Sequence, residues 1–235
     1  MKKTALYSTK ILSILSLCIF IISCGEDEPQ TWVGCYSSIT LGAQDNYSIG
    51  HFFKPQTGEV VAVENTAGQE KYLGLMFFTE SDGTNSWLTF PADGASAAVF
   101  SADKNRLFIQ TPGGTSTWPA ASIVSGMINK CSLTSVEFDN LMSTATWGNF
   151  DKVFKTNNNN KEYLEYKKNY VLTPESGDVY LAQFNGIVRA IICVKTVVKT
   201  GSNGGSITYD IIVEGKDAYS NSSSAKYLQP IQSNQ

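Results

Sequence analysis

The strictest constraint on this fold is a pattern of alternating residues near the C-terminus. The segment DVYLAQF (178–184) is followed by Asn185-Gly186 and then by IVRAIICVKTVV (187–198). Asn-Gly tolerates the positive φ angles of a tight hairpin turn, so these segments predict two paired strands. Along the second strand, period-two spacing places Val188, Ala190, Ile192, Val194 and Val198 on one face, interrupted only by Thr196.

A third strand follows, SITYDIIVE (206–214), and it completes a predicted three-stranded meander. Ile207, Tyr209, Ile211 and Val213 share one face, opposite Thr208, Asp210 and Glu214. Such alternation is typical of a sheet with one buried face. Upstream, short apolar segments are separated by links rich in Gly, Asn, Asp and Pro. We therefore predict a mainly β chain, an antiparallel β-sandwich or open barrel.

Helix is expected in one or two short places only. In CSLTSVEFDNLM (131–142), Thr134 and Glu137 have the spacing of a capping box, and Leu133 and Phe138 that of a hydrophobic staple. A second short helix is expected near residues 149–154. No repeat or linker divides the region, so residues 32–235 are interpreted as one β-rich domain, used for ligand binding or as an accessory.

The N-terminus has the organisation of an export signal. Lys2, Lys3 and Lys10 precede an apolar stretch at 11–22, which is too short to span a bilayer but suits a signal peptide. The segment IISC (21–24) resembles the lipobox of bacterial lipoproteins, which implies that Cys24 is acylated and becomes the new N-terminus. An ordinary signal peptide with a chance cysteine is the alternative. On the lipoprotein interpretation residues 1–23 are removed. Separately, because the chain has a single histidine and no clustered cysteines, no metal or other cofactor is expected.

Residues 24–31 form a predicted acidic tether. The segment GEDEP (25–29) resembles the acidic export signal that follows the lipidated cysteine in surface lipoproteins of the Bacteroidetes, although a plain solvated leash would have the same composition. Without residues 1–23 the chain has 15 basic and 21 acidic residues, a net charge of −6. With no basic cluster, nucleic acid is not expected as a partner.

Residues with recognisable chemistry are few. The chain has one histidine, His51, which we interpret as structural, and no nucleophile, metal or nucleotide motif. The segment at 80–85, ESDGTN, is interpreted as a hairpin turn rather than a calcium loop. Trp87 is assigned to the core. Trp118, expected in an exposed loop, and Trp147, at an expected helix end, are candidates for a ligand platform or an interface, with a core role as the alternative. Cys35, Cys131 and Cys193 show no metal-binding spacing.

A wider resemblance concerns ITLGAQDN (39–46), GHFFKPQTGEVV (50–61) and SLTSVEFDNL (132–141). These segments look like parts of Bacteroidetes surface lipoproteins that accompany SusC/SusD-type importers, including the RagA/RagB-like peptide importers. At least one relative of that type has been described as lipid-binding. The resemblance implies a non-enzymatic accessory at the outer membrane, facing the exterior, that captures oligopeptide or glycan or docks on the importer.

The C-terminal meander also resembles the haem-scavenging HmuY-like lipoproteins. That weaker resemblance implies a small-molecule carrier for haem or lipid. With one histidine, a bis-histidine haem site is excluded within one molecule, and Met76, Met127 or Met142 would have to serve as axial ligands. An esterase- or glycosidase-like enzyme is a third hypothesis, which the absence of catalytic motifs disfavours.

Overall fold

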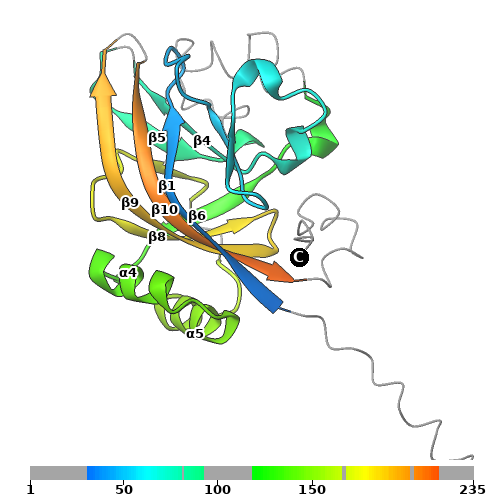
Figure 1. Ribbon diagram of the computed structural model, residues 1–235, viewed down its shortest axis with the longest axis vertical. Coiled ribbons are helices and arrows are strands. Elements are labelled where there is room, and N and C mark those ends of the chain that lie inside the picture. Colours follow the sequence, from blue (N-terminus) through cyan, green and yellow to red (C-terminus); the bar gives the residue numbers. More distant parts are fainter. Residues whose placement is uncertain (1–30, 81, 93–117, 166–167, 202–203, 217–235) are drawn as a thin grey trace, which may run out of the picture. The chain divides into compact units, whose positions relative to one another are not determined.

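The computed structural model describes residues 31–80, 82–92, 118–165, 168–201 and 204–216 (Figure 1). This part of the chain is mainly β and forms two antiparallel five-stranded sheets. Listed in spatial order, the first sheet comprises β1 (Thr31–Gly42), β10 (Gly204–Lys216), β9 (Val188–Thr200), β8 (Val179–Phe184) and β6 (Gly126–Lys130). The second comprises β3 (Glu59–Val61), β2 (Phe52–Lys54), β4 (Leu75–Thr79), β5 (Ser86–Thr89) and β7 (Tyr170–Leu172). The predicted fold class, mainly β with antiparallel strands, is confirmed, and of the two predicted architectures, a β-sandwich or an open barrel, the two sheets are consistent with the sandwich.

The main core lies between the two sheets and is built from alternate residues of nearly every strand. From the second sheet it includes Phe53, Phe77 and Leu88, and from the first Ile192 and Tyr209. Most of these side chains are completely buried. Burial of apolar surface on this scale is the dominant favourable term in folding, so the interior between the sheets holds the sandwich together.

The predicted meander is present as β8, β9 and β10, with Asn185 and Gly186 both at positive φ in the first turn. The predicted core face is correct up to Val194, but the assignment of Val198 is wrong. The register shifts between Thr208, which is opposite Thr196, and Tyr209, which is opposite Val194, so Lys195 of β9 is an extra residue with no residue of β10 directly opposite it. This bulge reverses the alternation beyond it. Val197 therefore packs on the core, and Val198 is 44% exposed.

Two α-helices cover part of the outer face of the first sheet (Figure 1). The first, α4 (Ser135–Ser143), begins with the predicted capping box between Thr134 and Glu137. The second, α5 (Trp147–Asn157), has Thr146 as its N-cap and turns Phe150 and Phe154 inward. With Phe138 and Leu141 of α4, these rings pack on Ile191, Cys193 and Ile212. The predicted single buried face is thus wrong here, because β8, β9 and β10 are buried on both faces beneath the helices.

A third cluster lies on the outer face of the second sheet. It contains Phe52, Met76, Phe78, Trp87 and Trp118, together with Val63 of the short 3-10 helix η2 (Val63–Asn65) and Leu73, which follows a second 3-10 helix, η3 (Glu70–Tyr72). A further 3-10 helix, η5 (Ala120–Ser122), follows Trp118. β4 and β5 are paired as the predicted hairpin, and at its end the Glu80 N–H donates to the Asn85 carbonyl at 3.0 Å.

Candidate functional site

A cleft opens where the edge strand of one sheet meets the edge strand of the other. It lies between β6 and β7 and has a volume of about 550 Å³. Ile128, Val171 and Tyr180, which belong to the core between the sheets, contribute its apolar lining. Its polar lining is contributed by Asn129, Lys130, Lys168, Thr173, Glu175 and Asp178. A lining that combines apolar side chains with a few polar groups is typical of small-ligand sites, whose volumes are of the same order.

Asp178 is the most organised polar group of the cleft. Its carboxylate accepts hydrogen bonds from the Tyr180 hydroxyl at 2.6 Å and from the Glu175 N–H at 3.2 Å, and it pairs with Lys130 Nζ. Burial raises the pKa of Asp178, but the bonds from Lys130 and Tyr180 outweigh that effect and hold the pKa below its usual value. Burial and the neighbouring carboxylate both raise the pKa of Tyr180. Asp178 therefore stays ionised and fixes the side chains around it.

The two strands that border the cleft turn backbone groups toward it. The Cys131 N–H donates to Val179 of β8 and the Thr173 N–H donates to Ser86 of β5. Because successive N–H groups of a strand point to opposite edges, the N–H groups of Lys130 and Leu172 point away from their own sheets and toward the cleft. At one end, the Ile128 N–H donates to the Lys168 carbonyl at 3.0 Å and fastens the chain before β7 to β6.

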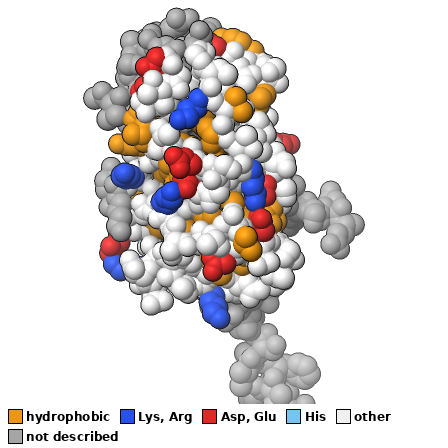
Figure 2. All heavy atoms as spheres, turned by 90° about the vertical axis from the view of Figure 1, so that its left-hand side faces the viewer, with side chains coloured by type: hydrophobic (Ala, Val, Ile, Leu, Met, Phe, Trp, Pro, Cys, Tyr) orange, Lys and Arg blue, Asp and Glu red, His pale blue; other side chains and the backbone are white. Residues whose placement is uncertain are grey.

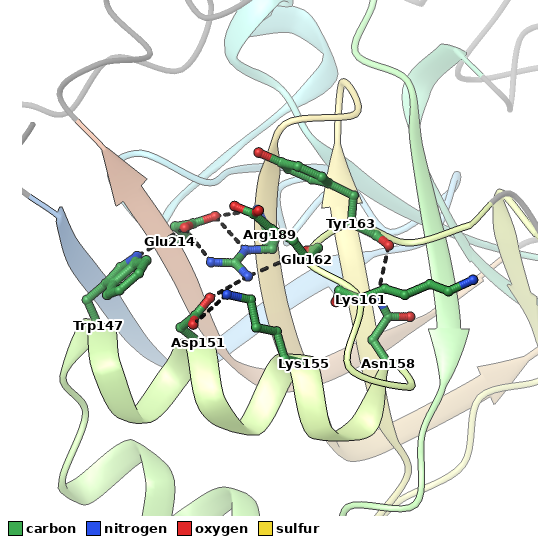
Figure 3. Close-up of polar contacts among 9 residues, drawn as sticks. All are labelled: Trp147, Asp151, Lys155, Asn158, Lys161, Glu162, Tyr163, Arg189 and Glu214. Carbon is green, nitrogen blue, oxygen red and sulfur yellow. Dashed lines mark hydrogen bonds and ion pairs between the residues drawn. The ribbon is translucent and has the colours of Figure 1, made fainter.

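A network of buried charges lies beneath α5 (Figure 3). Arg189 of β9 contacts Glu214 of β10 through two hydrogen bonds, Nε to Oε2 at 2.9 Å and Nη2 to Oε1 at 2.7 Å. Its Nη1 donates to Asp151 of α5 at 2.8 Å. The guanidinium also lies over the rings of Phe150 and Phe154. Burial lowers the pKa of Arg189, but the two carboxylates raise it by more. The network ties α5 to the sheet.

The two candidate tryptophans lie far from one another in the fold. Trp147 is half-buried, and its Nε1 donates to Glu214 at 3.0 Å, which joins it to the charge network (Figure 3). Trp118 is only 6% exposed and lies 5.1 Å from Phe52 between ring centroids, on the outer face of the second sheet. The expectation that Trp118 stands in an exposed loop is wrong, since this ring completes an aromatic cluster. Cys24 lies outside the described residues.

His51 and Trp87 have the structural positions expected for them. His51 is 1% exposed, and its Nδ1 accepts a hydrogen bond from the Val63 N–H at 3.2 Å. Trp87 is 5% exposed and stacks on Phe78. Cys35, Cys131 and Cys193 are free thiols. Cys131 and Cys193 both lie opposite Val179, on either side of β8, so two strand spacings separate them, about 10 Å, too far for a disulfide.

The methionines considered as haem ligands belong to two different clusters. Met76 is on the outer face of the second sheet, whereas Met127 and Met142 pack in the cluster between the first sheet and the helices. The whole sandwich separates Met76 from the other two, so Met76 and either of them cannot ligate one haem.

Charges of both signs occur together on the surface. Figure 2 shows one face of the molecule, on which acidic and basic side chains lie next to one another with hydrophobic side chains exposed between them. In the described ranges, no helix is long and apolar enough to cross a membrane. The same ranges contain no group of three or more His, Cys, Asp or Glu side chains placed to hold a metal ion.

The cleft residues carry no signal in the sequence, because Lys130, Lys168 and Asp178 are brought together only when two sheet edges meet. Trp118 and Trp147, which the sequence did single out, do not line it. Comparison of the chain with protein-family models, with curated proteins and with solved structures finds no match.

Proposed function

We propose that this protein is a non-enzymatic cell-surface lipoprotein that serves an outer-membrane nutrient importer as an accessory, capturing oligopeptide or glycan or docking on the importer. The observation that carries the capture role is the cleft of about 550 Å³ between β6 and β7, whose apolar side chains and fixed polar groups suit a small ligand. Its central carboxylate, Asp178, is already bound by Lys130 and Tyr180, which suits recognition better than proton transfer.

The anchor in this proposal is Cys24, acylated after removal of residues 1–23. From Cys24 to Thr31, the first residue of β1, the tether reaches at most about 25 Å when fully extended. The domain would therefore stay close to the outer leaflet, within reach of an importer barrel and its capping lipoprotein. A net charge of −6 gives no attraction to anionic lipid, so a protein partner is the better means of orienting it.

The test of the accessory role is purification of the tagged protein from native outer membrane in mild detergent, at endogenous expression. We expect a SusC-like barrel and its SusD-like lid to co-purify, and cross-linking on intact cells to find the same neighbours. Elution of the tagged protein alone, with no such neighbours cross-linked, would refute the accessory role.

The anchor and the display signal are tested separately. Cys24→Ala should abolish acyl labelling and release the protein from the membrane fraction. Replacing Glu26, Asp27 and Glu28 by Ala should leave acylation intact but reduce cleavage of the protein by protease added to intact cells. A Cys24→Ala protein that still carries acyl label would disprove the lipobox assignment.

A further inference from the structure

This inference rests on the capture role proposed above, and it concerns the free edge of β7, where the chemical class of the captured ligand can be argued. We infer that the cleft binds a short extended peptide with free termini, which adds as an antiparallel strand to β7. Its amino group would lie beside Glu175 and its carboxylate beside Lys168. The ligand class would then be unblocked oligopeptides rather than glycans.

The first argument is the backbone of β7. This strand is at the edge of the second sheet, paired only with β5. The N–H of Leu172 points toward the cleft, because the next N–H, that of Thr173, donates to Ser86 in the opposite direction. A row of outward backbone groups on an edge strand is a template for another extended chain. A sugar has no matching repeat of donors and acceptors.

The second argument is the exposed apolar side chain at that edge. Leu172 is 48% exposed, although natural edge strands are commonly protected by charge, proline or a covering segment. Val171, Ile128 and Tyr180 contribute further apolar lining to the same cleft. A peptide on β7 would cover Leu172 and place alternate side chains against this apolar lining.

The third argument is charge. Lys168 and Glu175 line the cleft before and after β7, and both are exposed. Within the described ranges neither side chain has an ion pair or hydrogen bond, whereas Lys130 and Asp178 already satisfy one another. In an antiparallel pair the added strand runs from the C-terminal end of β7 to its N-terminal end. Its amino group would therefore approach Glu175, and its carboxylate would approach Lys168.

The length of the ligand follows from β7. The strand has three residues, and the two charged residues lie just beyond its ends. At about 3.3 Å per residue, a peptide of about five residues would pair along β7 and reach both charges with its termini.

The experiment measures retention of a pentapeptide mixture, randomised at every position, on immobilised full-length protein in mild detergent, by quantitative mass spectrometry. The mixture is used with free termini, N-acetylated, or C-amidated. We expect each blocked mixture to be retained about two- to five-fold less than the free one, the range expected for loss of one exposed ion pair. In Lys168→Met the C-amidated mixture should be retained as well as the free one, while the effect of N-acetylation remains. In Glu175→Gln the N-acetylated mixture should be retained as well as the free one, while the effect of C-amidation remains.

The backbone pairing is tested with Leu172→Pro and its matched control Leu172→Ala. Proline removes the N–H that faces the cleft and no hydrogen bond to β5, and it is tolerated on a sheet edge. We expect Leu172→Pro to lose retention of the free mixture and Leu172→Ala to lose less. A second test leaves the protein unchanged and compares two peptide mixtures, one N-methylated at the central residue and one at a neighbouring residue. Because only one of two successive N–H groups can face β7, only one of the two mixtures should be retained less.

The inference is overturned if no pentapeptide mixture is retained, if retention ignores the state of the termini, or if N-methylation has equal effects at both positions. Retention of glycans but not peptides would also overturn it. In those cases co-purification with the importer would still uphold the accessory role. Conversely, peptide retention by a protein that purifies without partners would refute the accessory role alone.

Discussion

Arg189 and Glu214 form a bidentate ion pair in which both side chains are completely shielded from solvent. The two residues are on neighbouring strands of the first sheet, and α5 closes over them with Asp151 and Trp147 (Figure 3). Two buried charges are expensive to desolvate, so the pair persists because almost every polar atom around it has a partner. Variants of this pair therefore test directly how much the buried charges contribute to the stability of the fold.

We expect Glu214→Leu to lower the free energy of unfolding by about 3–5 kcal/mol, because it removes the carboxylate that pairs with Nε and Nη2 and leaves the buried guanidinium with Asp151 as its remaining counter-ion. The double variant Arg189→Leu/Glu214→Leu should cost less than the sum of the single variants, since neither member of the fully buried pair is left without the other and Asp151 keeps its ion pair with Lys155. Urea unfolding followed by tryptophan fluorescence measures both. Lys161→Ala, at an exposed ion pair with Glu165, is the control, and a loss there as large as that in Glu214→Leu would contradict this account.

The capping box of α4 is predicted to be a local source of stability. Thr134→Ala removes the hydroxyl that accepts the Glu137 N–H and should cost about 1 kcal/mol. Thr134→Ser keeps the acceptor and should stay near the wild type. If alanine and serine unfold at the same urea concentration, the cap contributes nothing measurable to stability.

The titration of His51 should make the free energy of unfolding depend on pH, in a range where no other type of side chain ordinarily titrates. Burial lowers the pKa of His51, partly offset by Glu64, and Nδ1 is occupied as an acceptor from Val63. The unfolded chain therefore binds a proton at a pH where the folded chain does not. Stability is fully present above about pH 6.5 and falls as the pH is lowered, by at most about 1.4 kcal/mol per pH unit.

The check is urea unfolding at several pH values between 7.5 and 5. His51→Asn keeps an acceptor near the position of Nδ1 but does not titrate, and His51 is the only histidine of the chain. The slope seen in the wild type should be absent in this variant. An unchanged slope would assign the pH dependence to other groups.

Asp178 should also make the protein less stable as the pH falls, but over a lower pH range than His51. Its folded pKa lies below the usual value, so the stability it contributes is present above about pH 4 and is lost as the pH falls through the folded pKa. Asp178→Asn should destabilise the protein at pH 7 by about 1.5–3 kcal/mol, through loss of charged hydrogen bonds. The difference from wild type should shrink below pH 3. An equal difference at pH 7 and pH 2.5 would show that the carboxylate charge is not responsible.

The three cysteines of the domain should react with a thiol reagent in the order of their exposure. Cys35 is exposed, Cys131 is half-buried and Cys193 is buried. In native protein we expect Cys35 to be modified first and Cys193 only when the domain unfolds. Peptide mapping after timed alkylation gives the order. Rapid modification of Cys193 would mean that α4 and α5 open frequently.

Local patterns in the sequence were enough to predict several elements correctly. The Asn185-Gly186 turn, the capping box at Thr134 and the alternation of β10 each depend on residues close together in the chain, and each is present in the structure. Turn and cap chemistry act over a few residues, so their signals survive without knowledge of the fold.

Other features were decided by tertiary structure. Val198 is not on the predicted face, because a bulge at Lys195 reverses the alternation beyond it. Glu214 is on the predicted polar face of β10, but α5 covers that face and Glu214 is buried. Trp118 is buried in an aromatic cluster despite its Gly- and Pro-rich surroundings. The cleft residues Lys168 and Glu175 are separated from Lys130 by many positions. Alternation along a strand specifies which residues share a face, but what covers that face, and which edges meet, depends on packing between segments distant in the chain.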